Sequence, residues 1–211
     1  MYIDYTKSLS EEFIREFQYE VDWNYISINQ KLSEDFIREF QDKVNWYNVS
    51  YSQKLSEEFI REFQHKISWF YISKFQKLNE KFIREFQDKF DWQWISAYQI
   101  LNENFIRDFK DKIDWVYISA NQILSEEFIK EFQDKVCWVN ISFRQKLSEE
   151  FIREFKNKIK WKYLLKKFGY KLELSLNNKY QIISDNYRSD LLCFPEFLKL
   201  TLRLISLKVF Q

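Results

Sequence analysis

Residues 32–54 read LSEDFIREFQDKVNWYNVSYSQK, and this 23-residue unit recurs along most of the chain. Seven copies start, without insertion or deletion, at Leu9, Leu32, Leu55, Leu78, Leu101, Leu124 and Leu147. A fixed period of about 20 to 50 residues is typical of stacked repeat architectures. Such proteins bind partners along an extended surface more often than they catalyse reactions. Positions are numbered from the leucine, so that Leu32 is position 1 and Lys54 is position 23.

The composition indicates a folded and heavily packed protein. Aromatic residues make up 20% of the 211 residues and charged residues 31%, more aromatic content than a disordered chain carries. The chain has one glycine and one proline, whereas proteins average about 7% and about 5% of these residues. Its turns must therefore be formed by other means.

Position 2 of every repeat is a residue that caps helices. The seven residues are Ser10, Ser33, Ser56, Asn79, Asn102, Ser125 and Ser148. Their side-chain oxygens can accept backbone N–H groups that are left unpaired at a helix start. Leu9 and Ile14, at positions 1 and 6, have the spacing of a hydrophobic staple across this cap. We therefore expect a first helix, helix A, to begin here in each repeat.

A second set of capping residues stands at position 14. It comprises Asp22, Asn45, Ser68, Asp91 and Asp114. Val21 and Ile26 flank the first of these as another staple pair. Cys137 occupies the position in the sixth repeat, where we expect a poor cap and a local loss of stability. A second helix, helix B, is expected to follow, so that caps replace glycine and proline.

Each helix has one apolar face. In helix A, positions 5, 6, 9 and 13 are apolar in every repeat, and these offsets fall within about 100° of one face. In helix B, Trp, Ile or Val, Ser and Gln recur at positions 15, 18, 19 and 22 of the first six repeats. We expect the small serine to let helices approach closely and the glutamine to link adjacent repeats. The predicted fold is all-α, an α-solenoid of two-helix 23-residue repeats, in which neighbours cover each other's apolar faces.

The repeats define a helical array over residues 1–169. Tyr2 aligns with Tyr25, so we expect the array to open with a partial helix B over residues 1–8 that lacks its tryptophan. That would leave the first apolar face without a polar cap. A second copy of the chain, a partner, or descent from a longer array would each account for such an edge, and self-association there is one expectation.

Residues 170–211 form a separate, basic C-terminal cap on this interpretation. Residues 171–176 and 179–184 flank Asn177 and alternate between apolar and polar side chains, as do residues 198–204. A period of two predicts β-strands. A small cap built on a β-hairpin is therefore expected, with a pair of atypical helices as the alternative.

Charge is distributed unevenly along the chain. Residues 1–152 carry 20 Lys or Arg and 27 Asp or Glu, a net charge of −7, and residues 153–211 carry 13 and 5, a net charge of +8. The candidate polyanion-binding residues are Lys156, Lys158, Lys160, Lys162, Lys166 and Lys167. Nucleic acid or another polyanion is therefore an alternative partner, although the acidic array would repel phosphates along most of its length.

Opposite charges recur four residues apart on helix A. The pairs are Glu11 with Arg15, Glu39 with Lys43, Glu85 with Lys89 and Glu126 with Lys130. This order and spacing favour ion pairs within each helix. We therefore expect a solvated ladder of charges rather than a pair of catalytic carboxylates.

No residue pattern indicates catalysis, a metal or a cofactor. His65 is the only histidine, and Cys137 and Cys193 are far apart in sequence, so neither a metal-ligand spacing nor a nucleophile with its base is present. Cys193 lies in an apolar run and is expected to be a small buried hydrophobe. A reactive thiol at Cys137 is the weaker alternative. We expect a protein that is not an enzyme and that has no cofactor.

The sequence favours a place inside the cell. The first residues lack the basic start and apolar core of a signal peptide. No apolar run approaches the roughly 18 residues of a membrane-spanning helix. Two cysteines without a framework spacing indicate a reducing compartment, most simply the cytoplasm. An amphipathic membrane contact through residues 194–210 is less favoured, because that segment alternates rather than follows a helical period.

The most informative functional signal is the variation between near-identical copies. Positions 16, 17, 20 and 21 of helix B vary freely and lie opposite its Trp, Ile, Ser and Gln stripe. The candidate partner-binding residues there are Tyr47, Tyr51, Phe70, Phe75, Trp94, Tyr98, Tyr117, Phe143 and Arg144. Exposed aromatic residues in such numbers favour a protein-recognition surface. The alternative is that neighbouring helices cover these positions or that nothing constrains them.

The repeat resembles short tandem repeats found in proteins of giant DNA viruses that infect protists. The matching phrases are LSEEFIREFQDKVDW and WxxISxxQK, and the resemblance covers residues 1–168, about 80% of the chain. It implies an α-helical repeat and interactions inside a host cell. The family has no known activity to carry over, and residues 170–211 lie outside the resemblance.

Overall fold

The computed structural model describes residues 3–5, 7–167, 170–174 and 180–184. Within these residues it has fourteen α-helices and two β-strands. The chain divides into two compact units, Met1–Ile113 (unit 1) and Asp114–Gln211 (unit 2). In both units each repeat forms two short helices, as predicted, and the fold is an all-α stack of the α-solenoid class.

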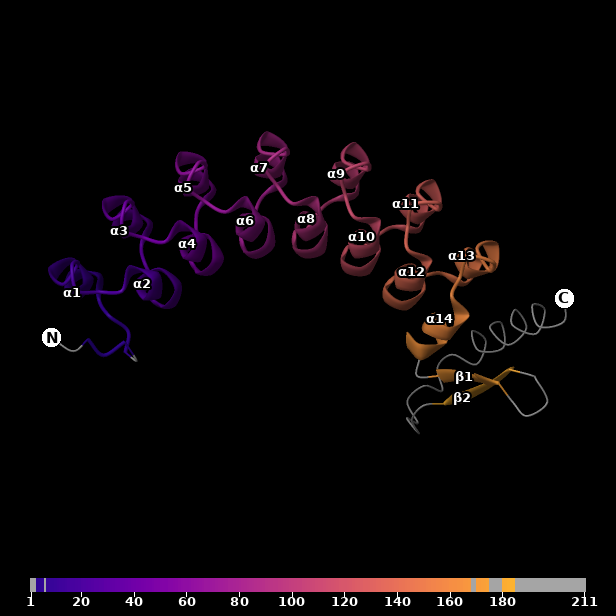
Figure 1. Cartoon of the computed structure of the whole chain (residues 1–211). Helices are drawn as coiled ribbons and strands as arrows, with labels where there is room; N and C mark the ends of the chain where they lie inside the picture. The colour runs from indigo at the N-terminus through magenta and orange to yellow at the C-terminus, as the bar shows by residue number, and fades with distance from the viewer. Residues whose placement is uncertain (1–2, 6, 168–169, 175–179, 185–211) are drawn as a thin grey trace. The chain divides into compact units, whose positions relative to one another are not determined.

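Unit 1 contains two rows of helices. Its helices are α1 (Glu11–Glu16), α2 (Trp23–Asn29), α3 (Glu34–Glu39), α4 (Trp46–Ser52), α5 (Glu57–Glu62), α6 (Trp69–Phe75), α7 (Glu80–Glu85), α8 (Trp92–Tyr98) and α9 (Glu103–Asp108). The odd-numbered helices are the predicted helices A and the even-numbered ones the helices B. Figure 1 shows that the row of helices B follows the concave side of this unit.

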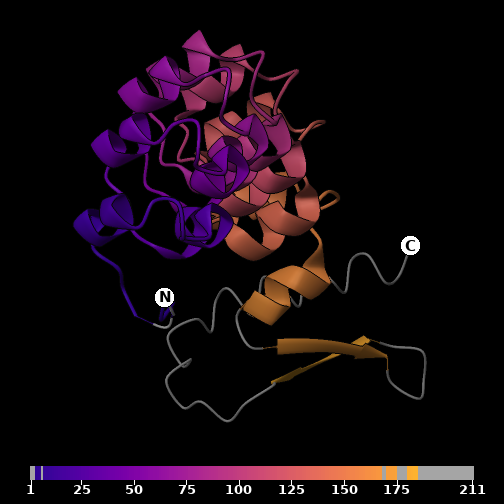
Figure 2. The same ribbon diagram turned by 60° about the vertical axis from the view of Figure 1, so that its left-hand side comes forward.

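Unit 2 continues the same alternation and ends in a strand pair. It contains α10 (Trp115–Asn121), α11 (Glu126–Glu131), α12 (Trp138–Arg144), α13 (Glu149–Glu154), α14 (Trp161–Lys167), β1 (Tyr170–Leu174) and β2 (Tyr180–Ser184). The strands pair antiparallel, with Tyr170 opposite Ser184, and they follow α14 (Figure 2). They overlap the two segments in which alternation predicts strands. The turn at Asn177 and the strand predicted at 198–204 lie outside the described residues.

The predicted caps of helix A form in all seven repeats. Each side-chain oxygen at position 2 accepts the backbone N–H of the residue three positions later, as Ser33 Oγ does from Phe36 at 3.1 Å. At position 14, Asp22, Asn45, Asp91 and Asp114 accept N–H groups from the first turn of helix B. The turns between helices are therefore made by caps, as expected.

Two residues at position 14 begin a helix without capping it. Ser68 and Cys137 precede α6 and α12, and neither side chain makes a cap hydrogen bond. The prediction is confirmed for Cys137 and wrong for Ser68. Ser68 has ψ 105° whereas Ser33 has ψ 155°. At the smaller angle the longer Asp and Asn side chains reach the N–H groups of the first turn, and the serine hydroxyl does not.

The core is built from contacts between repeats. In unit 1 the Trp23 ring lies 6.2 Å from the Phe36 ring and 5.0 Å from the Phe40 ring, and Trp46 packs on the next repeat in the same way. Phe36 and Ile37 are fully buried. Trp23 and Trp46 thus cover the phenylalanine pair of the following helix A, and Trp69 covers Phe86 and Phe90 there, which explains why a single repeat does not bury its own face.

Buried polar side chains at positions 19 and 22 join successive repeats. Ser27 Oγ donates to the Trp23 carbonyl at 2.6 Å and accepts the N–H of Asn45, 18 residues later, at 2.9 Å. Gln53 Nε2 donates to the Gln30 carbonyl at 2.8 Å. The predicted link through glutamine is confirmed. The serine has a second function beyond its small size, because it bonds to the start of the next helix B.

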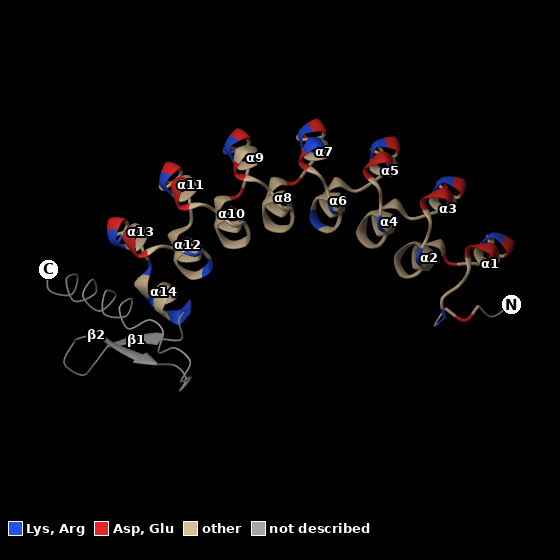
Figure 3. Ribbon diagram, turned by 180° about the vertical axis from the view of Figure 1, so that it is seen from behind, with Lys and Arg blue, Asp and Glu red and all other residues tan. Residues whose placement is uncertain are grey.

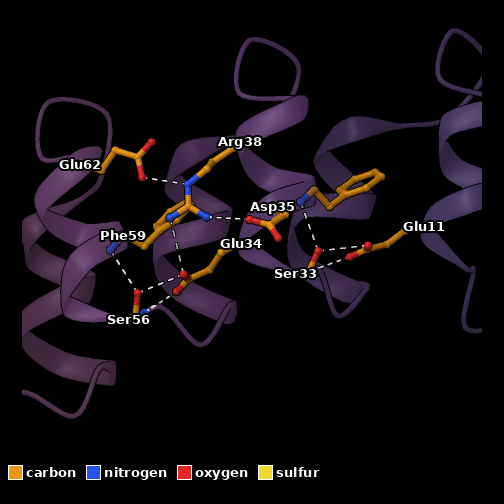
Figure 4. Close-up of polar contacts among 9 residues, drawn as sticks. Glu11, Ser33, Glu34, Asp35, Arg38, Ser56, Phe59 and Glu62 are labelled. Atoms are coloured by element: carbon orange, nitrogen blue, oxygen red, sulfur yellow. Dashed lines mark hydrogen bonds and ion pairs between the residues drawn. The ribbon is translucent and has the colours of Figure 1, made fainter.

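The charged residues of helix A also bond between repeats, and the predicted pairs within one helix form only in some repeats: Arg38 with Glu34 and Arg107 with Glu103, both at 3.8 Å, and Arg153 with Glu149. Glu11 accepts the N–H and hydroxyl of Ser33, and Glu34 does the same for Ser56 (Figure 4). Arg15 lies 2.7 Å from Glu39 rather than pairing with Glu11. The adjacent parallel helix A places a carboxylate 24 residues later closer to the arginine than the carboxylate one turn earlier.

The other three predicted pairs are also replaced. Lys43 donates to Gln18 at 2.6 Å, and Lys130 pairs with Glu154 at 2.6 Å. Glu85 is held by Arg61 through two hydrogen bonds of 2.8 Å. The hydrogen bonds from Arg61 lower the pKa of the Glu85 carboxyl.

The start of unit 1 differs from the predicted partial helix. The described residues among the first eight, 3–5 and 7–8, are not helical. The Tyr5 ring packs 4.7 Å from Tyr25, its hydroxyl accepts the Asp22 N–H at 2.7 Å, and Tyr25 donates to the Tyr5 carbonyl at 2.8 Å. These contacts hold the described, non-helical residues against α2. They do not replace the tryptophan of a preceding repeat, because Phe13 and Phe17, which it would cover, stay half-buried.

Candidate interaction surface

Helices A and B of unit 1 present surfaces of different charge. Figure 3 shows that acidic and basic residues gather on α1, α3, α5, α7 and α9, whereas α2, α4, α6 and α8 are largely uncharged. No aspartate or glutamate occurs from position 15 to position 23 of any repeat. Carboxylates therefore lie on the helix A side or in the caps.

Cations on the two sides also differ in their partners. All five arginines of unit 1 lie on helices A and are ion-paired, namely Arg15, Arg38, Arg61, Arg84 and Arg107. The helix B segments carry Lys31, Lys54, Lys74 and Lys77, and none of these lysines forms an ion pair with a described residue. The charge of the helix B side is thus positive and uncompensated.

Seven aromatic residues form a continuous surface across α4, α6 and α8, which we call the aromatic patch. Its members are Tyr47, Tyr51, Phe70, Tyr71, Phe75, Trp94 and Tyr98. Tyr47 is 59% exposed and Tyr98 56%, and Tyr51, Phe70 and Phe75 are each 44 to 45% exposed. The patch lies at positions 16, 17, 20 and 21, opposite the buried stripe of each helix B.

Tyr71 is the centre of the patch. Its ring centroid lies 4.5 Å from Tyr47, 5.2 Å from Tyr51, 5.1 Å from Phe70 and 5.9 Å from Phe75. Its hydroxyl donates a hydrogen bond to the Tyr47 hydroxyl. This hydrogen bond, with desolvation and the charges of the neighbouring tyrosines as smaller causes, raises the pKa of Tyr71 to about 12. The centre is therefore pre-organised by ring contacts and one polar link.

Lys74 brings a positive charge into the patch. Its Nζ lies 4.3 Å from the centre of the Trp94 ring and 5.2 Å from that of Phe75. Trp94 in turn stacks on Tyr98, with ring centroids 5.7 Å apart. The ammonium group is held over two rings and is not neutralised by any described carboxylate.

Six of the predicted partner-binding residues are brought together in this patch: Tyr47, Tyr51, Phe70, Phe75, Trp94 and Tyr98. Tyr71 and Lys74 were not predicted. Tyr71 stands at position 17, as Tyr117 and Trp94 do, so the variation between repeats that indicated those two residues could also have indicated Tyr71. Position 20 also varies between repeats, and this variation could have indicated Lys74.

The other three predicted residues belong to unit 2. Tyr117 and Phe143 are half-buried on α10 and α12, and Arg144 is exposed. The Arg144 guanidinium lies 5.1 Å from the centre of the Phe143 ring. They therefore form a separate, smaller feature within unit 2.

The six candidate polyanion-binding lysines fall into two groups. Lys158 pairs with Asp134 at 2.8 Å and donates to Gln133, so it serves the stacking of repeats. Lys167 donates to the Gln145 carbonyl, and burial lowers the pKa of its amine. The remaining four are exposed and make no ion pair with a described residue: Lys156, Lys160, Lys162 and Lys166.

The histidine and the two cysteines singled out in the sequence are not among the residues that define these surfaces. His65 is exposed on the surface. Cys137 is half-buried with a free thiol, and Cys193 lies outside the described residues. No three described His, Cys, Asp or Glu residues are grouped so that they could hold a metal ion. None of the helices in the described part of the chain is long and apolar enough to cross a membrane.

The structure defines the chain as a tandem helical repeat protein with a period of 23 residues. The chain matches no protein-family model, no curated protein and no solved structure. Its function must therefore be argued from its own surface.

Proposed function

We propose that this protein is a non-enzymatic scaffold that binds a partner protein through the helix B surface, with the aromatic patch of unit 1 as the principal site. The observation that carries the proposal is the continuous, exposed patch across three successive helices B. Clusters of tyrosine and tryptophan on a rigid support are typical of binding hot spots, because large rings bury much area with little loss of side-chain entropy.

The separation of stacking residues from variable residues within each repeat supports this proposal. Helix A and the buried stripe of helix B carry the contacts between repeats, and these residues hardly change between copies. The outward positions of helix B also contact the neighbouring repeat, as Tyr47 contacts Tyr71, but their residues vary from copy to copy. A surface that varies on a constant support can be fitted to one partner without altering the fold.

Affinity capture from a nuclease-treated cell lysate tests the proposal. The variant carries Tyr71→Asn, Phe75→Ser, Trp94→Asn and Tyr98→Ser, in which each new residue already occurs at the same position of another repeat, as Asn48 and Ser52 do. The matched control is Tyr19→Asp, because Tyr19 is 85% exposed on the helix A side and other repeats have Asp there.

We expect wild type and the control to capture the same proteins and the variant to lose them. Equal capture by all three proteins would mean that the aromatic patch is not the binding site. Circular dichroism of the three proteins measures whether they are equally helical.

Polyanion binding through unit 2 is the second candidate function. The observation that favours it is the group of four exposed lysines over residues 156–166 without ion pairs to described residues. Binding of this kind would weaken steeply with salt and would depend on Lys160 and Lys162. Gel-shift titration with single-stranded and double-stranded DNA at two salt concentrations, using Lys160→Gln with Lys162→Gln, tests it.

We infer a cytoplasmic protein from the two cysteines, which have no framework spacing, and a relation to giant-virus repeats from the two matching phrases. Self-association at the first repeat is supported by the Phe13 and Phe17 pair of α1, which stays half-buried, whereas the equivalent Phe36 and Phe40 are buried.

A further inference from the structure

We propose that the aromatic patch recognises an anionic segment of the partner protein, one in which aspartate or glutamate side chains stand beside an aromatic or aliphatic residue. This inference rests on the proposed function of the patch and adds the chemistry of its ligand. It is carried by the segregation of charge between the two sides of each repeat.

The helix B side of unit 1 is free of carboxylates over a long distance. Residues 23–31, 46–54, 69–77 and 92–100 contain no aspartate or glutamate, and α4 and α6 begin at the neutral residues Asn45 and Ser68. Unit 1 as a whole has 16 Lys or Arg and 20 Asp or Glu, a net charge of −4. The positive charge of the helix B side therefore results from where charged residues lie within each repeat, and not from the net charge of unit 1, which is negative.

The positive groups are arranged around the patch. Lys74 lies inside it, over the Trp94 ring at 4.3 Å. Lys31, Lys54 and Lys77 each follow the last residue of a helix B and its glutamine C-cap, so they line the C-terminal edge of α2, α4 and α6. All three are exposed and none is ion-paired with a described residue. A ligand lying across α4, α6 and α8 would place its carboxylates within reach of this row.

The patch also supplies neutral hydrogen-bonding groups. The hydroxyl of Tyr47 accepts from Tyr71, and its own proton can be donated outward. A phenol that donates to a carboxylate forms a charge-assisted hydrogen bond, which is stronger than a bond to a neutral acceptor. The exposed rings, already held in mutual contact, offer apolar surface on which one apolar side chain of a peptide can pack.

Single-stranded nucleic acid is the other anionic ligand that pairs with aromatic residues and lysines, and the geometry favours it less. Base recognition of that kind needs exposed ring faces on which bases stack. In the patch, Tyr71 is in contact with four other rings, and Lys74 covers a face of Trp94. The net negative charge of unit 1 would also oppose a long phosphate backbone.

Selection from a library of random linear peptides displayed on phage tests the inference. Peptides are selected on the whole protein, and sequences that also bind the four-residue aromatic variant described above are removed. Enriched peptides are synthesised with a fluorescent label, and their affinities are measured by fluorescence polarisation. A single-stranded DNA oligonucleotide of mixed sequence is measured in parallel.

We expect the enriched peptides to combine acidic with aromatic or aliphatic residues. Lys74→Glu should weaken their binding about tenfold, which is a reasonable size for reversing one partly exposed charge contact. The matched control is Lys81→Glu, which makes the same charge change on α7 at a position where Glu12 and Glu58 occur in other repeats. It should leave the affinity within about twofold.

Failures of the two proposals are distinguishable. Enriched peptides that are neutral or basic, or equal weakening by Lys74→Glu and Lys81→Glu, would overturn the anionic ligand and keep the patch as a peptide site. Oligonucleotide binding that is tighter than that of every peptide and is lost in the aromatic variant would overturn it in favour of nucleic acid. Failure to enrich any peptide over the aromatic variant would overturn the proposed function itself.

Discussion

The side-chain amide of Gln53 bridges the junction between two repeats, because its Oε1 accepts the N–H of Leu32, the first residue of its own repeat, at 3.0 Å. Its Nε2 donates to the carbonyl of Gln30, two residues earlier, at 2.8 Å. Gln76 and Gln99 repeat the arrangement at the next two junctions between repeats. One side chain therefore satisfies a donor and an acceptor at the junction where the chain passes from helix B to the next helix A.

Replacing this glutamine should destabilise unit 1 strongly. In Gln53→Leu the Leu32 N–H and the Gln30 carbonyl stay buried without partners, and we expect unfolding to become easier by about 2 to 4 kcal/mol. The measurement is the urea midpoint of the far-ultraviolet circular dichroism signal. Lys54→Ile is the matched control, since it changes the adjacent exposed residue to one found at Ile100, and it should shift stability by less than about 0.5 kcal/mol. Equal midpoints for the two variants would show that the amide bridge is dispensable.

Supplying a missing cap should stabilise unit 2. Cys137 begins α12 without a side-chain cap, whereas Asp114 caps α10 through the N–H groups of Val116 and Tyr117. We expect Cys137→Asp to raise the free energy of unfolding by about 1 kcal/mol, from the cap hydrogen bond and from the favourable position of a carboxylate at a helix start. Cys137→Ala should change little. A Cys137→Asp protein no more resistant to urea than the alanine variant would contradict the prediction.

The hydroxyl pair at the centre of the patch should be visible in an alkaline titration. The pKa of Tyr71 is raised from 10.0 to about 12 by its hydrogen bond to Tyr47. A folded pKa above the ordinary value means that the pair stabilises the fold below pH 10.0 and that this contribution is lost as the pH rises through about 12. In Tyr47→Phe the hydrogen bond is absent, so Tyr71 should ionise at lower pH.

Phenolate absorbance, recorded as the difference between wild type and Tyr47→Phe, measures this effect. Tyr98→Phe also removes one phenol from the patch but leaves the pair, and it should retain the late phase of the titration. The assignment would be refuted by a late phase that survives in Tyr47→Phe.

Local features of the fold could be predicted from the sequence because they depend on neighbours in the chain. A cap such as Ser33 and its target Phe36 are three residues apart, and the apolar positions of one helix recur at its own period. Ser68 is the exception. It does not cap α6, because capping by serine also depends on a backbone angle that differs between the starts of helices A and B. The same reasoning indicated which positions of helix B face outward.

The glutamine link between repeats was predicted, but the partners of the charged residues could not be, because they depend on the offset between adjacent helices. Arg38 pairs with Glu62, 24 residues later, at 2.8 Å, although Glu34 is one turn away on the same helix. Glu34 instead bonds to Ser56, 22 residues later. Sequence spacing alone does not distinguish these partners. For the same reason the sequence indicated individual aromatic residues as candidates, whereas their contacts around Tyr71 could be seen only in the structure.

Removing one whole repeat should separate the fold from the binding surface. Excision of residues 55–77 joins Lys54 to Leu78, and the lost core contacts between repeats have equivalent replacements. Trp46 meets Phe82 in place of Phe59, and the amide of Gln99 meets Gln53 in place of Gln76. We therefore expect a folded protein with unchanged helicity per residue and a lower urea midpoint, because stability in repeat proteins falls with the number of interfaces.

The same excision removes α6 and with it Phe70, Tyr71, Lys74 and Phe75, so partner binding should be lost. Excision of residues 9–31 is the matched control, since it removes the same length, leaves α4, α6 and α8 intact, and should lower the urea midpoint by a similar amount while binding is retained. Capture of partner proteins by both shortened chains, alongside their urea midpoints, measures the two effects separately. Binding that survives without α6 would show that the aromatic patch is not the site, whereas loss of helicity in either protein would show that the 23-residue repeat is not an independent unit of stacking.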